Sequence, residues 1–354
     1  MQATRNDKHE SSINQQLATI NYLAIRMYFF QFIYIIVRFG IRLVLVRRKA
    51  VKHATDYLHQ IEEQFNGKFD EGTFKKVVKS HSVYLPIVND AFTALHDRTT
   101  TLKEQERSIH YFICSSLFDN FWDDKTLNID QLEQISFDTK RYPAKTFDEK
   151  VFVASHLFLL DEVKNKEAYL TIFRRTFNAQ QASLEQFNAG ITDNQITNIT
   201  FEKGGNAVLL CSYYLDIDTS VAEENCWYYL GSIIQLSNDL FDIYKDINDG
   251  IQTLATRCTN AYAMETFFLQ RLHLLKENIR LLEVSNSKKQ SFSIAMAATA
   301  VLGLVAIEQL KEIQASSNQL PDFKTLARKD LIVDMEKPKN ILRWIKLLYV
   351  HAKM

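Results

Sequence analysis

The stretch that decides the fold is Gln235-Leu-Ser-Asn-Asp-Leu-Phe-Asp-Ile-Tyr-Lys-Asp246. It places Asn238, Asp242 and Asp246 at positions i, i+4 and i+8, and an α-helix turns once in about 3.6 residues. These three oxygen-bearing side chains therefore share one stripe of a helix, with Asp239 beside them. Most of the residues between them and in the preceding turn are apolar or aromatic. The pattern predicts a largely buried helix with acids along one side.

A second stretch repeats this arrangement nearer the N-terminus. Phe118-Asp119-Asn-Phe-Trp-Asp123-Asp124 has acids at positions i, i+4 and i+5, at the end of another apolar segment. Acids that share a stripe repel one another unless a positive charge lies among them. Divalent cations such as Mg²⁺ take oxygen ligands and leave positions for water and phosphate. We therefore expect the two stripes to face each other across a metal site; the alternative is two solvated acidic faces.

Both stretches resemble metal-binding motifs of isoprenoid enzymes. Asn238-Asp-Leu-Phe-Asp242-Ile-Tyr-Lys-Asp246 is similar to the second metal motif of class I terpene synthases, Asn/Asp-Asp-x-x-Ser/Thr-x-x-x-Glu/Asp. Asp242 departs from that pattern and resembles the Asp-x-x-x-Asp form of squalene, phytoene and large-terpene synthases. The segment from Asp119 to Asp124 resembles the first Asp-rich motif of the same groups. The resemblance covers the central part of the chain.

The resemblance implies an all-α, single-domain helical bundle of the class I isoprenoid synthase type. It implies a lyase of isoprenoid biosynthesis that ionises a long prenyl diphosphate to a terpene hydrocarbon or alcohol, with about three Mg²⁺ ions. The expected metal ligands are Asp119, Asp123, Asp124, Asn238, Asp239, Asp242 and Asp246. The expected catalytic residues are Asp119, Asp123, Asn238, Asp242 and Asp246.

Two alternative functions stay open at this point. One is head-to-head condensation of prenyl diphosphates, as in squalene and phytoene synthases, because Asp119–Asp124 and Asp242–Asp246 also suit that pattern. The other is a non-catalytic helical protein that binds a prenyl lipid or a partner.

Further residues are predicted to bind the substrate. Lys203 precedes Gly204 and Gly205 in an apolar helical run, where each glycine costs about 1 kcal/mol against alanine. The pair indicates a kink or a close backbone approach; the alternative is a turn between two helices. Prenyltransferases have a similar Lys-Thr-Gly break upstream of the second motif. The predicted substrate-binding residues are Lys203, Gly205, Arg175, Gln235, Lys245, Phe112 and Trp227. For Arg175 the alternative is a solvated face, and for the aromatic residues it is the core.

The composition and the scarcity of the helix-breaking residues Gly and Pro favour a helical protein. The 354 residues include only nine Gly and four Pro, and 46% are apolar, which is enough for a large core. No alternating β-branched run lies between turn signals, so a sheet is not expected. A net charge of zero excludes general nucleic-acid binding. The four cysteines lack metal-type spacing, which indicates buried, reduced thiols in a cytoplasmic protein.

The N-terminal region has its own pattern. We expect residues 1–15 to be flexible and residues 16–354 to form one domain, with a basic apolar helix at about 20–48. No acid occurs between Glu10 and Asp56, and Arg38 and Arg42 interrupt the apolar run before about 20 residues accumulate. The helix is expected to pack on the core; the alternative is peripheral contact of residues 22–52 with an anionic membrane. The oligomeric state is left open between monomer and homodimer.

Two further features mark helix positions. Thr99-Thr-Thr-Leu-Lys-Glu104 has the pattern of a capping box and predicts the start of the helix that carries Asp119. Phe292 to Leu310 is rich in alanine and apolar residues, with Gly303 inside. We expect it to be a buried helix behind or along a substrate cavity.

Overall fold

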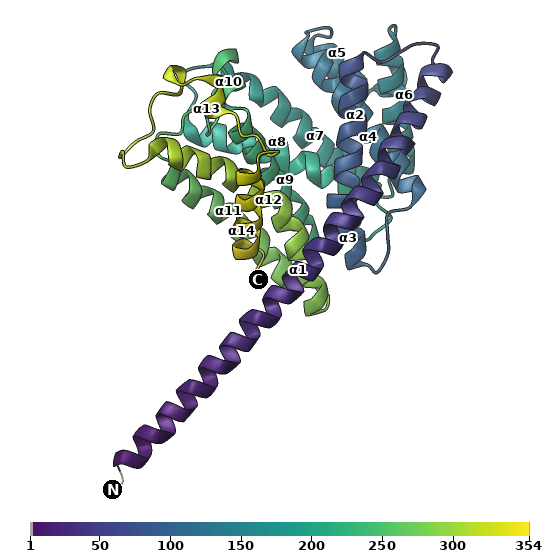
Figure 1. The fold of residues 1–354 in the computed structure, drawn as a ribbon. Coiled ribbons are helices and arrows are strands. Elements are labelled where there is room, and N and C mark those ends of the chain that lie inside the picture. The colour runs from purple at the N-terminus through teal and green to yellow at the C-terminus, as the bar shows by residue number, and fades with distance from the viewer. Residues whose placement is uncertain (1–2, 354) are drawn as a thin grey trace. The chain divides into compact units, whose positions relative to one another are not determined.

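The computed structural model describes the backbone of residues 3–353 and the side chains of residues 32–34, 36–38 and 40–353. In this part of the chain every regular element is a helix, as Figure 1 shows, and no strand occurs among the described residues. This confirms the all-α fold. It follows from the scarcity of Gly and Pro, which leaves long stretches able to keep their helical hydrogen bonds.

The chain divides into two compact units, residues 1–45 and residues 46–354. The long helix α1 (Ala3–Gln64) contributes to both. Its helical residues include 3–15, for which the sequence predicts a loose terminus. The acidic stretches and all the helices after α1 belong to the second unit.

The longer helices of the second unit follow one another through short loops. They are α2 (Glu71–Tyr84), α4 (Leu102–Asp123), α5 (Ile129–Phe137), α6 (Phe147–Glu162), α7 (Lys166–Ala182), α8 (Asp193–Leu210), α9 (Val221–Phe241), α11 (Ala261–Leu281), α12 (Asn286–Gln314) and α14 (Pro338–His351). Shorter helices are α3 (Asp90–Leu95), α10 (Ile243–Asp249) and α13 (Arg328–Leu331). Single helical turns connect some of them.

The helix that carries the first acidic stretch starts where the sequence predicts. The Thr101 side chain accepts a hydrogen bond from the Glu104 backbone N–H, and the Glu104 side chain accepts one from the Thr101 N–H, which completes a capping box. These bonds satisfy backbone donors that an α-helix leaves unpaired at its N-terminus. The capping-box prediction is confirmed.

The helix that carries the second stretch is interrupted. The sequence predicts one helix through Asp246, but α9 ends at Phe241, and Asp242 has φ −98° and ψ 9°. α10 then runs to Asp249 and ends at Gly250, whose φ of +73° suits a residue without a side chain. The Asp246 N–H still donates to the Asp242 carbonyl at 2.8 Å, so the acids remain within consecutive turns.

Helices α8 and α9 lie very close together. A Cβ atom added to Gly204 would lie 2.5 Å from the Gly231 carbonyl oxygen, and one added to Gly231 would lie 2.2 Å from the Gly204 oxygen. α8 runs without interruption through Gly204 and Gly205, so the predicted alternative of a turn is wrong and the predicted close backbone approach is confirmed. This contact sets Gly204, next to Lys203 in α8, against Gln235 of α9.

The centre of the second unit is apolar. Among the described helices, α12 is long and apolar enough to cross a membrane by length and composition, but 78% of its most apolar window is buried inside the protein. The predicted buried helix at 292–310 is therefore confirmed. Its Phe292 contacts Phe92, which stacks on Trp227 with ring centroids 3.6 Å apart.

Candidate active site

One cavity of about 370 Å³ brings the two acidic stretches together. Its wall is formed by residues of α2, α4, α6, α7, α8 and α9 and by Tyr214 of the turn after α8, and it includes Asp119 from the first stretch and Asn238 from the second. The volume lies within the range of small-molecule sites, roughly 300–1,000 Å³. The two stretches, far apart in sequence, thus contribute to the wall of one cavity.

Charged and aromatic groups occupy different levels of this cavity. The Tyr111 hydroxyl donates to the Ala207 carbonyl at 2.8 Å, and its ring lies 5.3 Å from that of Tyr214. Asp119 lies two turns further along α4, about 12 Å at 1.5 Å per residue. Lys203 lies one turn back along α8 and acts electrostatically on Asp123 of α4. The two helices are therefore antiparallel here, with charges at one level and tyrosines at the other.

The first acidic stretch has a lysine partner across the cavity mouth. The Lys76 ammonium donates to Asp119 Oδ2 at 2.7 Å, and both side chains are partly exposed. Burial and the charge of Asp119 raise the pKa of Asp123, whereas Lys203, Lys76 and Lys245 oppose the rise. An exposed ion pair is worth about 0–1 kcal/mol, so Lys76 is free to exchange Asp119 for an anionic ligand at little cost.

The second stretch contains two buried acids. Asp239 accepts hydrogen bonds from Gln235 Nε2 at 2.9 Å and Thr200 Oγ1 at 3.2 Å, yet burial raises its pKa to about 6. Burial, followed by the charges of Asp239 and Asp242, raises the pKa of Asp246 to about 7. Each acid thus disfavours ionisation of the next, and a cation among them would relieve that repulsion.

The donor set suits a hard divalent cation. Its candidate ligands are carboxylate and amide oxygens from α4, α9 and the α9–α10 junction, which are the ligand types that Mg²⁺ takes. Among the side chains that the structure describes, no three His, Cys, Asp or Glu residues converge closely enough to hold an ion by themselves. Mg²⁺ keeps several waters and completes its shell with substrate phosphates, so it does not need a closed cage of protein ligands. The residues fit Mg²⁺ held jointly with a phosphate ligand.

The other predicted site residues divide into two groups. Lys203, Gln235 and Phe112 line the cavity. The described lining does not include Gly205, Arg175, Lys245, Trp227, Asp123, Asp124, Asp239, Asp242 or Asp246. Arg175, Asp124 and Asp242 are exposed, Gly205 packs against Tyr228, and Trp227 is fully buried in the core. Lys245 acts on Asp123 and Asp246 through its charge.

Several lining residues were not found from the sequence. Lys76 pairs with an acid 43 residues away, so no local spacing reveals it. His156 and Phe173 lie on helices α6 and α7, where an aromatic residue on a buried face is indistinguishable from core until the tertiary structure is known.

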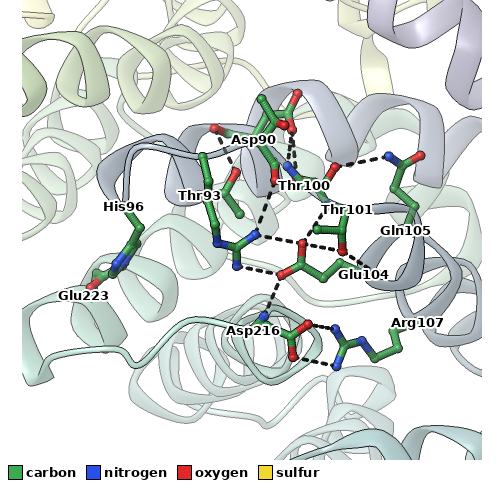
Figure 2. Close-up of polar contacts among 12 residues, drawn as sticks. Asp90, Thr93, His96, Thr100, Thr101, Glu104, Gln105, Arg107, Asp216 and Glu223 are labelled. Atoms are coloured by element: carbon green, nitrogen blue, oxygen red, sulfur yellow. Dashed lines mark hydrogen bonds and ion pairs between the residues drawn. The ribbon is translucent and has the colours of Figure 1, made fainter.

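A polar network fixes the start of α4 to the loop before α9, as Figure 2 shows. Glu104 is fully buried and accepts two hydrogen bonds from Arg98, at 2.9 and 2.7 Å, and one from the Asp216 backbone N–H at 2.6 Å. Arg107 of α4 donates to both Asp216 carboxylate oxygens, at 3.1 and 2.6 Å. The network therefore sets the position of the helix that carries Asp119 against the chain that leads to Asn238.

Comparison with known proteins gives limited information. No family model matches the chain, and no curated protein sequence matches it. Among solved structures, the chain is similar to a dehydrosqualene synthase determined in complex with a ligand, with 13% sequence identity and a TM-score of 0.44. The match covers 79% of this chain and 98% of the other. A similarity of this size assigns neither a family nor a reaction.

Proposed function

We propose that this protein is a Mg²⁺-dependent class I terpene synthase that ionises a long prenyl diphosphate to a terpene hydrocarbon or alcohol. The observation that supports this most directly is the joint presence of Asp119 and Asn238 in the wall of one aromatic cavity. Lys76 and Lys203 lie in the same wall. Acids for a cation, lysines for a phosphate and an aromatic chamber are the three parts that ionisation of an allylic diphosphate requires.

The lysines would hold the diphosphate. Charge-assisted hydrogen bonds from Lys76 and Lys203 to phosphate oxygens are stronger than neutral ones. Mg²⁺, when bound by the carboxylates, supplies further positive charge to the leaving group. Gln235, which donates to Asp239, orients one of these carboxylates. The proposed ligand set remains Asp119, Asp123, Asp124, Asn238, Asp239, Asp242 and Asp246, with about three ions.

The aromatic wall would hold the hydrocarbon chain and the cation. Phe118, Phe152 and Phe173 line the cavity, and aromatic faces attract positive charge through their quadrupole. The apolar surroundings exclude water, which would otherwise trap the cation.

The second candidate reaction is head-to-head prenyl transfer. It is favoured by Asp242 in the Asp242-x-x-x-Asp246 pattern, in place of the Ser or Thr of typical terpene synthases. The two reactions use the same diphosphate-binding residues and differ in whether the cavity accepts one prenyl chain or two.

One experiment separates the candidates. Purified protein is given single prenyl diphosphates of several chain lengths with Mg²⁺, and the products are identified by mass spectrometry while released diphosphate is measured. A product of unchanged carbon number supports the terpene synthase, and a doubled skeleton supports the prenyltransferase. Binding of the diphosphates without any release would show a non-catalytic prenyl-lipid-binding protein and end the proposal.

We also propose that the protein is cytoplasmic and touches a membrane surface through α1. Six apolar side chains of this helix are between 40% and 64% exposed: Ile33, Tyr34, Val37, Ile41, Val44 and Leu45. At 100° per residue they occupy one arc of about 120°. Arg38 and Lys49 lie beyond one edge of this arc, Arg47 lies beyond the other, and Arg48 falls on the arc itself just after Leu45; all four are exposed.

This arrangement is typical of a helix that lies in the interface of an anionic bilayer. The apolar arc would enter the acyl boundary while the arginines reach the headgroups. The absence of acids between Glu10 and Asp56 means that no residue there repels anionic lipid. A substrate with a long hydrocarbon chain would be delivered from the same surface.

A further inference from the structure

Two rows of polar side chains descend the wall of the cavity, one on α2 and one on α4. The rows are Lys76, Ser80 and Tyr84 on α2, and Asp119, Ser115 and Tyr111 on α4. Within each row the residues are four apart, so they share one face of their helix. Each row therefore passes from a charged group through a serine to a tyrosine.

The two rows lie antiparallel and face each other. The ion pair described above joins their charged ends, and the rings of Tyr84 and Phe112 lie 5.2 Å apart at the other end. Residue numbers thus rise along α2 as those of the contacting residues fall along α4. This register places Ser80 at the level of Ser115. The two serines lie one helical turn, about 6 Å, further into the cavity than the ion pair.

Three hydroxyls of these rows are accessible and unpartnered. Those of Ser80, Ser115 and Tyr84 make no hydrogen bond to another described residue, and each oxygen keeps accessible surface. Tyr84 does so although burial raises the pKa of its hydroxyl, so the space that it meets is the cavity. The Tyr111 hydroxyl, in contrast, donates to Ala207. We call the three accessible groups the hydroxyl cluster.

We propose that the hydroxyl cluster holds a water molecule, which ends the reaction by adding to the carbocation. This inference rests on the proposed ionisation of a prenyl diphosphate, and it makes the product an alcohol. A cavity holds a water where it is roomy and offers two to four polar partners, and each hydroxyl can donate once and accept twice. A lone pair of the water oxygen forms the C–O bond to the cationic carbon. The resulting oxonium loses one proton to the released diphosphate.

The position of the hydroxyl cluster selects the carbon that reacts. The diphosphate is expected beside Lys76 and Asp119, and the two serines lie about 6 Å further in. The cationic carbons nearest to the water are then those of the first isoprene unit. Addition at its substituted carbon gives a tertiary alcohol. Phe118, Phe152 and the other aromatic residues of the wall exclude bulk water from the rest of the chain, so the cation meets water at the hydroxyl cluster.

Product analysis in oxygen-labelled water tests the proposal. The wild type should form a tertiary alcohol of unchanged carbon number that carries the label. Ser80→Ala/Ser115→Ala and, separately, Tyr84→Phe remove hydroxyls without adding bulk, and alanine favours helices. Each should lower the ratio of alcohol to olefin at least about fivefold. Diphosphate release should stay within about threefold of the wild type, because ionisation does not use these groups.

The control is Thr176→Val in α7. Thr176 also lines the cavity, but its hydroxyl already donates to the Ile172 carbonyl at 3.0 Å, so this change should leave the alcohol unchanged. A wild type that releases diphosphate and forms olefin alone would overturn the proposal. An unchanged ratio of alcohol to olefin in both test variants would do the same.

A binding measurement tests the same hydroxyls without turnover. Nerolidol carries a tertiary hydroxyl at the expected carbon, and β-farnesene has the same skeleton without it. With Mg²⁺ and inorganic diphosphate present, calorimetry should show that Ser80→Ala/Ser115→Ala weakens binding of nerolidol about tenfold and of β-farnesene less than twofold. Equal effects on both ligands, or none, would contradict the hydroxyl cluster. This selectivity in a protein that releases no diphosphate would refute the proposed function and leave the hydroxyl-binding site.

Discussion

The carboxylate of Asp119 is expected to matter for activity but not for the stability of the fold. Its carboxylate accepts from Lys76 in a partly exposed ion pair, which contributes little to the fold. We predict that Asp119→Asn lowers Mg²⁺-dependent diphosphate release at least about a hundredfold, because a charged ligand of the leaving group's cations is lost. The free energy of unfolding should change by less than about 0.5 kcal/mol. Initial rates and urea denaturation measure the two effects.

The control for this prediction is Asp161→Asn. Asp161 is an exposed acid that pairs with Lys166 at 3.7 Å and lies outside the cavity lining. It should retain both rate and stability. If Asp119→Asn retained the wild-type rate, the assignment of this carboxylate to the diphosphate site would be wrong.

Glu104, in contrast to Asp119, is predicted to matter for the stability of the fold. Burial alone would raise its pKa, but hydrogen bonds from Arg98, Thr101 and Asp216 lower it to about 2. We predict that Glu104→Gln lowers the free energy of unfolding by about 2–4 kcal/mol, because the fully buried partner of the half-buried Arg98 loses its charge. A depressed acid pKa stabilises the fold above the ordinary value near 4.5, and this contribution is lost as the pH falls towards 2.

The measurement is urea denaturation of wild type and variant at several pH values. The difference between them should be full at pH 7 and shrink below about pH 4.5. Glu133→Gln, which breaks an exposed pair with Arg174, is the matched control and should change the free energy of unfolding by less than about 0.5 kcal/mol. A difference independent of pH would mean that packing, not charge, holds Glu104.

At the scale of elements, the close contact between α8 and α9 affects both the stability of the fold and the geometry of the active-site cavity. We predict that Gly204→Ala destabilises the protein by about 1–3 kcal/mol, although alanine favours helices, because a Cβ there meets the Gly231 backbone. The helices must separate, which moves Lys203 away from Gln235, so activity should fall as well. Gly40→Ala in α1 is the control, since nothing lies within 4 Å of its added Cβ. A stable, fully active Gly204→Ala variant would show that the contact tolerates separation.

The contact of α1 with a membrane is also a property of one element. We predict that the full chain co-sediments with vesicles containing anionic phosphatidylserine and binds neutral phosphatidylcholine vesicles far less. Ile41→Glu/Leu45→Glu should abolish binding by removing the apolar arc. Arg38→Gln/Arg47→Gln should weaken it roughly fivefold per charge, since each basic residue contributes about 1 kcal/mol near such a surface.

The control for vesicle binding is Val221→Glu/Leu102→Glu, which changes exposed apolar residues at the starts of α9 and α4. It should bind as the wild type does. Equal binding to neutral and anionic vesicles, or none to either, would reject the proposal. A dimer in solution that Ile41→Glu/Leu45→Glu dissociates would instead identify the arc as an interface between two copies.

For the whole molecule, local patterns in the sequence predict where the helices lie along the chain better than they predict which residues of different helices come into contact. The i, i+4 spacing of the acids, the capping box at Thr101 and the apolar run of α12 depend on neighbours in sequence, so they could be predicted. The Lys76–Asp119 pair and the register that sets Ser80 at the level of Ser115 depend on which helices pack together. The interruption at Asp242 was also missed, because the acids keep a helical spacing across it.

The last prediction concerns three buried histidines. Burial lowers the pKa of His81 to about 3, with the charge of His53 adding to the effect, and lowers those of His110 and His156 to about 4. In the unfolded chain the ordinary value is 6.5. Between these values each histidine binds more protons in the unfolded state than in the folded state, so its contribution lowers the free energy of unfolding as the pH drops below 6.5. The raised pKa values of Asp239 and Asp246 act in the opposite direction over the same range.

The expected loss is roughly 2 kcal/mol per histidine at pH 5, relative to pH 8. Urea denaturation of the wild type and His156→Phe at pH 8, 6 and 5 measures it, and this window lies above the range in which the contribution of Glu104 changes with pH. Because Asp239, Asp246 and the other histidines are common to both proteins, the difference in free energy of unfolding between the wild type and His156→Phe should change by roughly 2 kcal/mol between pH 8 and pH 5. Because each histidine has an unpartnered ring nitrogen, protonation would place a charge against apolar packing with no acceptor. A difference between the wild type and His156→Phe that is flat between pH 8 and pH 5 would show that this ring reaches water or a counter-charge in the folded protein.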